Sequence, residues 1–364
     1  MKAECSLEKI KKAVDQAERI TGKNLTLPVL GSVLISASGK SLKMRATNLS
    51  LGVEIEIPAK IQKEGQLAVP GGVLSDVFLN VFGEENVVLE GSGGNLEIHT
   101  KRNKIKIKGQ NHEDFPTIPT VSGKEIKIDP KRLTDGIRSV YYSSAISDIK
   151  PEISSVYIYG EDENLVFVAT DSFRLAEKKI KARGADDVSL LIPFKNIPEI
   201  LRVLQDFTEE AELCYSKNQV SIASGGVYLT SRVVNGIFPD YRQIIPRESK
   251  TQAVLLKEEL LNALKLSNVF SDKFSQVNLK ISPEKKIFEL SSANNDVGEN
   301  KTSVDAAITG EAVDLAFNYR YFLDCFQSIS ADSLALKFDG PSRPIVVAPV
   351  SDTSFSYLIM PMNR

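Results

Sequence analysis

The chain is poor in the residues that most enzymes use for chemistry. Among 364 residues there are only two histidines, and neither has a nucleophile and a carboxylate nearby in the sequence. We interpret His99 as a solvated strand residue and His112 as a solvated loop residue. No glycine-rich phosphate loop ends in Gly-Lys-Ser or Gly-Lys-Thr, and Gly71-Gly72 lacks the third glycine of a dinucleotide-binding fingerprint. We therefore expect no catalytic residue, no metal and no cofactor, so the protein is not predicted to be an enzyme.

Cysteines and long apolar runs are also scarce. Cys5, Cys214 and Cys325 are far apart and lack metal-ligand spacing, so a disulfide framework is not expected. No run of about eighteen apolar residues could cross a membrane, and no apolar signal-peptide stretch follows Met1. These features favour a cytoplasmic protein without a membrane partner. The net charge of −2 argues against binding nucleic acid by bulk positive charge, but it is compatible with one basic face.

The strongest positive feature is a threefold internal repeat with a period of about 123 residues. Apolar-alternating segments that end in small residues and then Asn or Asp occur at 42–48, 165–171 and 288–294. Proline-containing pairs keep nearly the same spacing, at Phe115-Pro116, Phe238-Pro239 and Met360-Pro361. Because independent landmarks agree on one period, the sequence predicts three tandem copies of one module.

Each module is predicted to contain two helices and an antiparallel sheet. First helices are expected after Ser6, Asp129 and Leu256, and Ser6 and Asp129 suit the N-cap position. Second helices are expected to start at Val69-Pro70, Ile192-Pro193 and Ala316-Phe317. Their apolar residues recur at helical spacing, so each helix should bury one face. These residues are Val73, Leu74, Val77, Phe78 and Val81; Ile197, Ile200, Leu201 and Leu204; and Phe322, Cys325, Phe326 and Ile329.

Strand patterns complete the module. Alternation at 53–57 and 104–108 has the period of half-buried strands, and 91–95 resembles a hairpin turn. Runs of strands with two helices per module place the chain in the α+β class. We place the modules at 1–120, 125–246 and 250–364, with linkers near 116–123 and 239–250.

Three segments resemble the bacterial DNA sliding clamp, the β subunit of DNA polymerase III. They are Val168–Leu175, Gly236–Arg242 and the ending Tyr357–Met362. The similarity runs in order through the whole chain and agrees with its length and its repeat. It implies a head-to-tail homodimer whose six modules close a ring around duplex DNA, with helices lining the hole and sheets outside.

The resemblance also implies the function and the partners. The protein would be a non-catalytic processivity factor that encircles duplex DNA without reading its sequence. Through a hydrophobic groove it would tether the replicative DNA polymerase, an ATP-dependent clamp loader and other proteins with a clamp-binding motif. A monomeric protein-binding scaffold that does not encircle DNA is the alternative, and native mass distinguishes the two.

The charge on the predicted helices has the sign expected for helices that line a hole around DNA. The six helices together carry +2 and the remainder of the chain −4. An ordinary solvated helix face would explain the same small value. As DNA-facing residues that contact phosphates we predict Lys12, Lys23, Lys150, Lys195 and Arg202.

The lysine-rich segment 104–108 is predicted to be an edge strand, because lysines protect open sheet edges. The family pattern places Ile105 at the dimer interface, opposite the helix that contains Leu266. Basic residues around Lys104 would meet acidic residues such as Asp296 and Glu299 of the partner copy. Lys265 stands where the family favours an apolar residue, so this chain departs from the pattern at the joint.

The resemblance places a partner-peptide groove on module 2 and the C-terminus. Its predicted residues are Ile153, Thr170, Ser172, Phe173, Arg174, Leu175, Pro239, Gln243, Ile244, Pro344, Leu358, Ile359, Met360, Pro361 and Met362. Flexible methionines suit a pocket that accepts varied peptides, although Met360 and Met362 could simply complete a sheet. The family commonly has Gly-His at Ser172-Phe173 and a longer ending. Deleting residues 358–364 is predicted to abolish peptide binding and leave the dimer intact.

Overall fold

The computed structural model describes residues 1–22, 27–147, 149–246 and 248–362. The chain divides into two compact units. Unit 1 contains Met1–Thr134 and Lys195–Val233, and unit 2 contains Asp135–Phe194 and Val234–Arg364. The chain therefore crosses between the units three times, each time inside the predicted second module, 125–246. The compact units do not coincide with the repeat.

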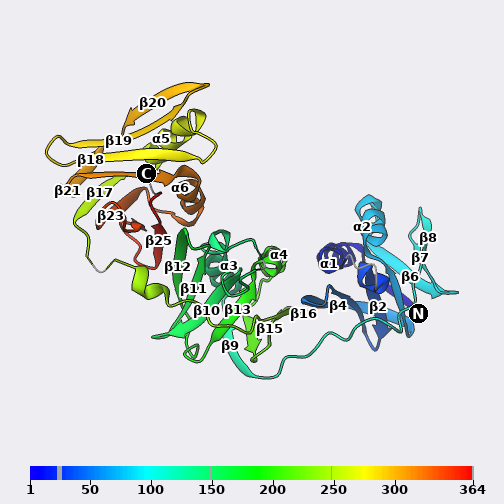
Figure 1. Ribbon diagram of the computed structural model, residues 1–364. Coiled ribbons are helices and arrows are strands. Elements are labelled where there is room, and N and C mark those ends of the chain that lie inside the picture. Colours follow the sequence, from blue (N-terminus) through cyan, green and yellow to red (C-terminus); the bar gives the residue numbers. More distant parts are fainter. Residues whose placement is uncertain (23–26, 148, 247, 363–364) are drawn as a thin grey trace. The chain divides into compact units, whose positions relative to one another are not determined.

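Unit 1 is built on a 12-stranded sheet (Figure 1). Its main path runs through β8 (Lys104–Lys108), β7 (Asn95–His99), β6 (Asn86–Ser92), β1 (Lys2–Ser6), β4 (Leu51–Lys63), β16 (Val227–Arg232), β15 (Gln219–Ser224), β14 (Ala211–Tyr215) and β9 (Lys124–Ile128). Off this path, β3 (Ser41–Thr47) pairs β4 and β2 (Ser32–Ser38), and β2 pairs β5 (Gly65–Pro70). Because β16 of the second module pairs β4 of the first, one sheet joins two modules.

Unit 2 contains two sheets. The nine-stranded sheet has the order β13 (Ser189–Pro193), β10 (Ser155–Glu161), β11 (Asn164–Thr170), β12 (Arg174–Lys181), β25 (Phe355–Ile359), β24 (Ile345–Pro349), β23 (Ser333–Phe338), β17 (Thr251–Leu256) and β21 (Ala306–Gly310). The four-stranded sheet runs β20 (Gly298–Ser303), β19 (Ile287–Asn294), β18 (Gln276–Ser282) and β22 (Val313–Asn318). Here β12 of module 2 pairs β25 of module 3, so the sheet again crosses a module border.

Six α-helices and five short 3₁₀ turns complete the described chain. Unit 1 holds α1 (Leu7–Ile20), α2 (Gly71–Asn80) and α4 (Ile197–Gln205). Unit 2 holds α5 (Lys257–Val269) and α6 (Tyr319–Cys325), while the border between the units falls within α3 (Pro130–Arg138), after Thr134. The 3₁₀ turns are η1 (Pro28–Gly31), η2 (Tyr141–Ser143), η3 (Phe194–Asn196), η4 (Tyr241–Ile244) and η5 (Phe326–Ser328). Three first helices and three second helices confirm the predicted module content.

Local chemistry explains most element boundaries. Asp129 accepts a hydrogen bond from the backbone N–H of Lys131 at 2.8 Å, and Pro130 occupies the first helical position as predicted. Ser6 stands at the N-cap of α1, but no capping hydrogen bond from its side chain is found among the described residues. Gly93 and Gly94 both have positive φ and close the predicted hairpin between β6 and β7.

Two predictions about the second helices are wrong in detail. All three predicted starts lie in strands, namely β5, β13 and β22, and the second helices begin only at Gly71, Ile197 and Tyr319. Val73 on α2 is 49% exposed, whereas Leu74 and Phe78 are buried as predicted. The apolar stripe of this short helix is narrower than its sequence suggested, because Val73 lies at its margin.

Candidate functional site

The predicted groove lies on one face of the nine-stranded sheet of unit 2. Leu175 and Leu358 are cross-strand neighbours, and both are almost fully buried. They belong to a buried apolar cluster with Val166, Val168, Leu191, Phe238 and Tyr241. Partly buried Ile245 and Val346 pack against the same cluster. The exposed residues of the predicted groove lie over this cluster, which we call the floor of the groove.

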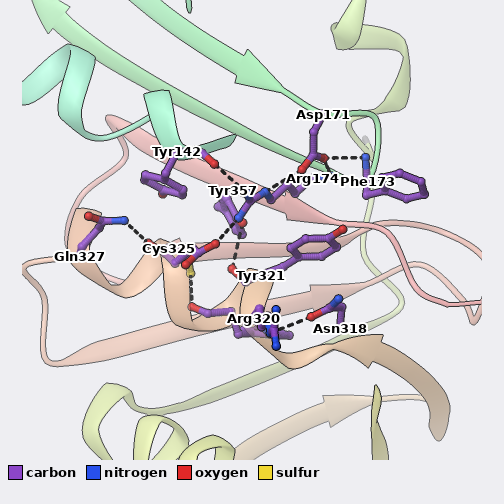
Figure 2. A network of polar contacts seen from close by, with 12 residues as sticks. Tyr142, Asp171, Phe173, Arg174, Asn318, Arg320, Tyr321, Cys325, Gln327 and Tyr357 are labelled. Carbon is purple, nitrogen blue, oxygen red and sulfur yellow. Dashed lines mark hydrogen bonds and ion pairs between the residues drawn. The ribbon is translucent and has the colours of Figure 1, made fainter. Parts of the chain in front are cut away.

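The turn between β11 and β12 forms one rim of the groove. Asp171 Oδ1 accepts hydrogen bonds from the backbone N–H of Phe173 at 2.9 Å and of Arg174 at 3.0 Å. Asp commonly closes a turn in this way, by accepting hydrogen bonds from backbone N–H groups two and three residues further on. Ser172 has a φ of 78°, in the left-handed region that favours glycine. The turn leaves Phe173 61% exposed, and Figure 2 shows its ring directed away from Arg174.

The C-terminal segment is attached to this rim. The N–H of Met360 donates to the carbonyl of Phe173 at 2.8 Å. Two residues later, the N–H of Met362 donates to the carbonyl of Ala316 at 2.7 Å. The segment 360–362 is thereby held between the module 2 turn and β22 of module 3, with all three side chains half-buried.

Arg174 is the centre of a polar network behind the rim (Figure 2). Its Nε donates to Asp171 at 2.9 Å, one Nη donates to Asp324, and the other donates to the carbonyl of Tyr142 at 2.7 Å. The guanidinium also lies 4.9 Å from the ring centroid of Tyr321. Burial alone would lower the pKa of Arg174, but Tyr357 and the two carboxylates raise it, so the charge is permanent. Arg174 thus ties the module 2 turn to α6 of module 3.

A second network holds η4, which we call the wall because it carries the predicted groove residues Gln243 and Ile244. Tyr241 donates to a carboxylate oxygen of Glu177, and its hydroxyl lies 2.7 Å from that of Tyr159. Arg242 donates to Tyr159 at 2.7 Å and to Glu161, and Lys179 donates to Glu161 at 3.1 Å. Burial, and then the Glu177 carboxylate, raise the pKa of Tyr241 far above its ordinary value. Tyr241 therefore stays neutral and serves as a hydrogen-bond donor.

The predicted groove residues fall into three groups, of which the half-buried one comprises Ile153, Arg174 and residues 360–362. Ser172, Phe173, Pro239, Gln243 and Ile244 are exposed and could touch a peptide directly. Thr170, Leu175, Pro344, Leu358 and Ile359 are buried, and so they support the surface from below. Ile153 is half-buried in the segment before β10. Its backbone carbonyl accepts a hydrogen bond from the N–H of Ala145, and its N–H donates to the carbonyl of Lys150.

Because residues 358 and 359 are buried, the predicted deletion of residues 358–364 is not a clean test of peptide binding. Leu358 is 2% exposed and Ile359 is fully buried in β25, between β12 and β24. Removing residues 358–364 would delete part of a central strand, so the predicted clean loss of peptide binding is not the expected result. Removal of residues 360–364 spares the strand and is the better test.

Two further hollows have the same construction at two sheet edges. In unit 1, Val73, Val77 and Val81 of α2 line a hollow with Ile105 of the edge strand β8. In unit 2, Ala263 and Leu266 of α5 line a hollow with residues 302–305, beside the edge strand β20. Leu266 is 46% exposed, and Ile105 is half-buried. Each hollow therefore offers an apolar patch next to an open strand edge.

The charges at these two edges are opposite. Lys101, Arg102, Lys104, Lys106 and Lys108 are exposed on and before β8, while Lys104 and Lys106 lie 3.7 and 3.9 Å from Glu97. Asp296 and Glu299 are exposed on and before β20, and Glu259 and Asp305 line its hollow, while the lysine of β20, Lys301, lies 3.0 Å from Glu289. The predicted joint residues are thus exposed or half-exposed on or beside the edge strands of the two sheets.

Predicted DNA-facing residues are exposed, but they differ in their partners. Lys12 lies 3.0 Å from Asp206, and Arg202 lies 3.2 Å from Glu199, so acidic side chains offset both charges. Lys150 and Lys195 are exposed. Lys23 lies outside the described residues. The sequence interpretation passed over Lys131, Arg132 and Arg138, which are exposed together on α3. Their spacing within a predicted helix could have identified them as candidates for DNA contact.

No group of three or more His, Cys, Asp or Glu side chains in the described ranges could hold a metal ion. In the same ranges, no helix is long and apolar enough to cross a membrane.

Comparison with known proteins covers nearly the entire chain. Three profiles of the DNA polymerase III beta subunit match it, the N-terminal domain at residues 1–119, the central domain at 127–240 and the C-terminal domain at 242–363. The beta sliding clamp of Synechococcus elongatus is 26% identical over 372 residues, spanning 100% of this chain and 99% of the relative.

Solved structures agree with the fold. The sliding clamp of Caulobacter crescentus is 26% identical, with a TM-score of 0.94 and complete coverage of both chains. That of Bacillus subtilis is 23% identical with a TM-score of 0.95, covering 100% of this chain and 99% of the other. The fold is three tandem clamp domains of mixed helix and sheet. On the three matched domains, this chain belongs to the DNA polymerase III beta subunit family, the bacterial sliding clamps.

Proposed function

We propose that this sliding clamp works as a head-to-tail homodimer that closes a six-module ring around duplex DNA. One observation carries the proposal, namely the matched construction of the β8 and β20 edges. Each edge has open backbone groups and an adjacent apolar hollow, and their charges are opposite. An isologous contact would bring each edge against its own copy, whereas a head-to-tail contact pairs the basic edge with the acidic edge. The module boundaries would be those of the repeat, at 1–120, 125–246 and 250–364.

Within this ring the protein acts by holding its partners, without catalysing a reaction. It tethers the replicative DNA polymerase and other proteins that carry clamp-binding peptides. These peptides insert apolar side chains between the Phe173 rim and the η4 wall, above Leu175 and Leu358. We place the protein in the cytoplasm, with ring opening driven by a separate ATP-dependent loader. DNA is contacted through phosphates by Lys150, Lys195 and the exposed cations of α3, while Lys12 and Arg202 contribute less because of their acidic neighbours.

A processivity assay tests this function. The polymerase of the same organism is loaded on a primed circular template with its loader and a competitor that traps released polymerase. With this protein present, product length per binding event should rise well above that of polymerase alone. Equal product lengths would contradict the proposal. A monomeric scaffold would bind the polymerase and yet leave product length unchanged.

A further inference from the structure

Beside the groove, the nine-stranded sheet carries a second hollow that contains none of the predicted groove residues. Its volume is about 500 Å³, and we call it the flank pocket. Its lining residues lie on or next to four strands of this sheet and in the segment that follows η4. All of these residues belong to unit 2, on and around β17, β23, β24 and β25.

Strand register shows that the flank pocket and the groove share one sheet face. Leu175 is paired with Leu358, which is paired with Val346 on the next strand. Val346 is in turn paired with Lys337, and Lys337 with Gln252. Directly paired residues on adjacent strands project to the same face. One row of side chains therefore runs from the floor of the groove into the flank pocket.

The hollow exists because the floor is made of small residues. Ala335 and Ala348 are paired on neighbouring strands, and Ser356 lies near them on β25. The segment after η4 forms a wall through Ile245 and Pro246. Ile245 and Val346 also pack against the apolar cluster that underlies the groove. Groove and flank pocket thus have a common border, made of these two side chains.

The lip of the flank pocket combines apolar surface with acidic charge. Val350 is 54% exposed at the lip and adds apolar surface there. Three carboxylates line the hollow, those of Glu248, Asp339 and Asp352, against one lysine, Lys337. Lys178 lies 3.3 Å from Asp352, whereas no ion pair of Glu248 or Asp339 is found in the described part of the chain. The occupant that complements this lip is apolar and basic.

We propose that the flank pocket binds the residues that adjoin the groove-bound peptide of a partner, an aliphatic side chain next to a lysine or arginine. This inference rests on the proposed function of the groove. From β25 to β17 the sheet advances by three strands, about 14 Å, because neighbouring strands are about 4.8 Å apart. An extended chain covers that distance in about four residues. A partner segment would therefore need only a short extension beyond its core to reach the pocket.

Three peptides, two pocket variants and one control variant test the proposal on the full-length protein. A peptide of about ten residues that binds wild type is selected from an overlapping scan of the replicative polymerase of the same organism. Versions lengthened by five native residues at either end are then compared with it by fluorescence anisotropy. Ala348→Trp fills the pocket, and the double variant Glu248→Lys with Asp339→Lys reverses its charge. The double variant Glu284→Lys with Asp186→Lys, at exposed turn residues, changes net charge equally.

We expect one lengthened peptide to bind wild type about tenfold more tightly than the core peptide. Both pocket variants should lose this gain and bind the core peptide normally, with unchanged Tm and native mass, while the control variant keeps the gain. Equal binding of core and both lengthened peptides to wild type would overturn the flank pocket alone, as would a gain that survives in both pocket variants. If no peptide of the scan bound wild type, the groove itself would be refuted and the inference with it.

Discussion

The sequence predicted which side chains lie at the rim, but not which distant residues they contact. The turn residue Asp171 and the exposed Phe173 follow from local sequence, because a polar residue after a strand closes a turn. The main partner of Arg174 outside this turn is Asp324, which lies 150 residues away. No local pattern connects two such residues, and only the pairing of β12 with β25 brings their elements together. For the same reason the Tyr241–Glu177 contact was hidden, although the motif around Tyr241 was recognised.

Arg174→Lys tests whether the rim depends on a forked guanidinium. One ammonium cannot reach Asp171, Asp324 and the Tyr142 carbonyl together, so we expect a loss of about 1–2 kcal/mol in the free energy of unfolding. Peptide affinity should fall as well, because the Phe173 turn loses its anchor. Urea unfolding and anisotropy measure the two effects. Arg320→Lys on α6, where Arg320 is exposed, is the matched control and should change neither.

Ser172 provides a test of backbone strain. Its φ of 78° is costly for a β-branched residue, because Cβ crowds the following carbonyl. Ser172→Val should therefore unfold more easily than Ser172→Gly by about 1–2 kcal/mol. Urea denaturation of the two variants checks this difference. Equal midpoints would show that the turn relaxes to another conformation.

Glu161 makes the η4 wall sensitive to acid. Partial burial would raise the pKa of Glu161, but hydrogen bonds from Lys179 and Arg242 outweigh it, so the pKa lies below its ordinary value. A carboxylate with a lowered pKa stabilises the fold fully above its unfolded pKa of about 4.3, and this contribution disappears as pH falls through the lower folded value. Between pH 7 and pH 3, wild type should lose more stability than Glu161→Gln. An identical pH dependence in both proteins would exclude this contribution.

At the scale of elements, strands and hairpins were predicted better than helix ends. The alternation at 53–57 and 104–108 lies inside β4 and β8, and the segments at 42–48, 165–171 and 288–294 overlap all but the first residue of β3, β11 and β19. The second helices were predicted to start too early because apolar strand residues lead directly into them. In module 3 the strand β22 continues to Asn318, whose side chain then caps α6 through the N–H of Arg320. Periodicity alone does not separate a buried strand end from a helix start.

The joint is tested by placing charge in its two apolar hollows. Ile105→Glu and Leu266→Glu each put a carboxylate into a patch that the ring model buries, so each should shift the native mass from about 80 kDa to the 40.0 kDa of one chain. Leu256→Glu is the matched control, since Leu256 is 49% exposed and Leu266 46% exposed. Light scattering that finds the mass unchanged in both joint variants would refute this joint.

At the scale of the whole molecule, the repeat predicted three modules but not how sheets join them. Period and length identify copies, whereas no local pattern shows which strand of one copy pairs with which strand of the next. The structure pairs β16 with β4 and β12 with β25, so each border between modules is a continuous sheet. The same principle, applied between the free β8 and β20 edges of two copies, would continue the sheets through the joint. Sheet continuity is thus the physical basis of the proposed ring.

The central claim is that DNA is held by topology and not by affinity. After loading on nicked circular plasmid, the plasmid with its bound protein is separated from free protein by gel filtration at raised salt. The plasmid is then cut once with a restriction enzyme. The account predicts that the protein stays with intact circles and leaves linear DNA, because screened phosphate contacts no longer retain it. Equal retention on circular and linear DNA, or equal loss from both, would contradict a closed ring around the duplex.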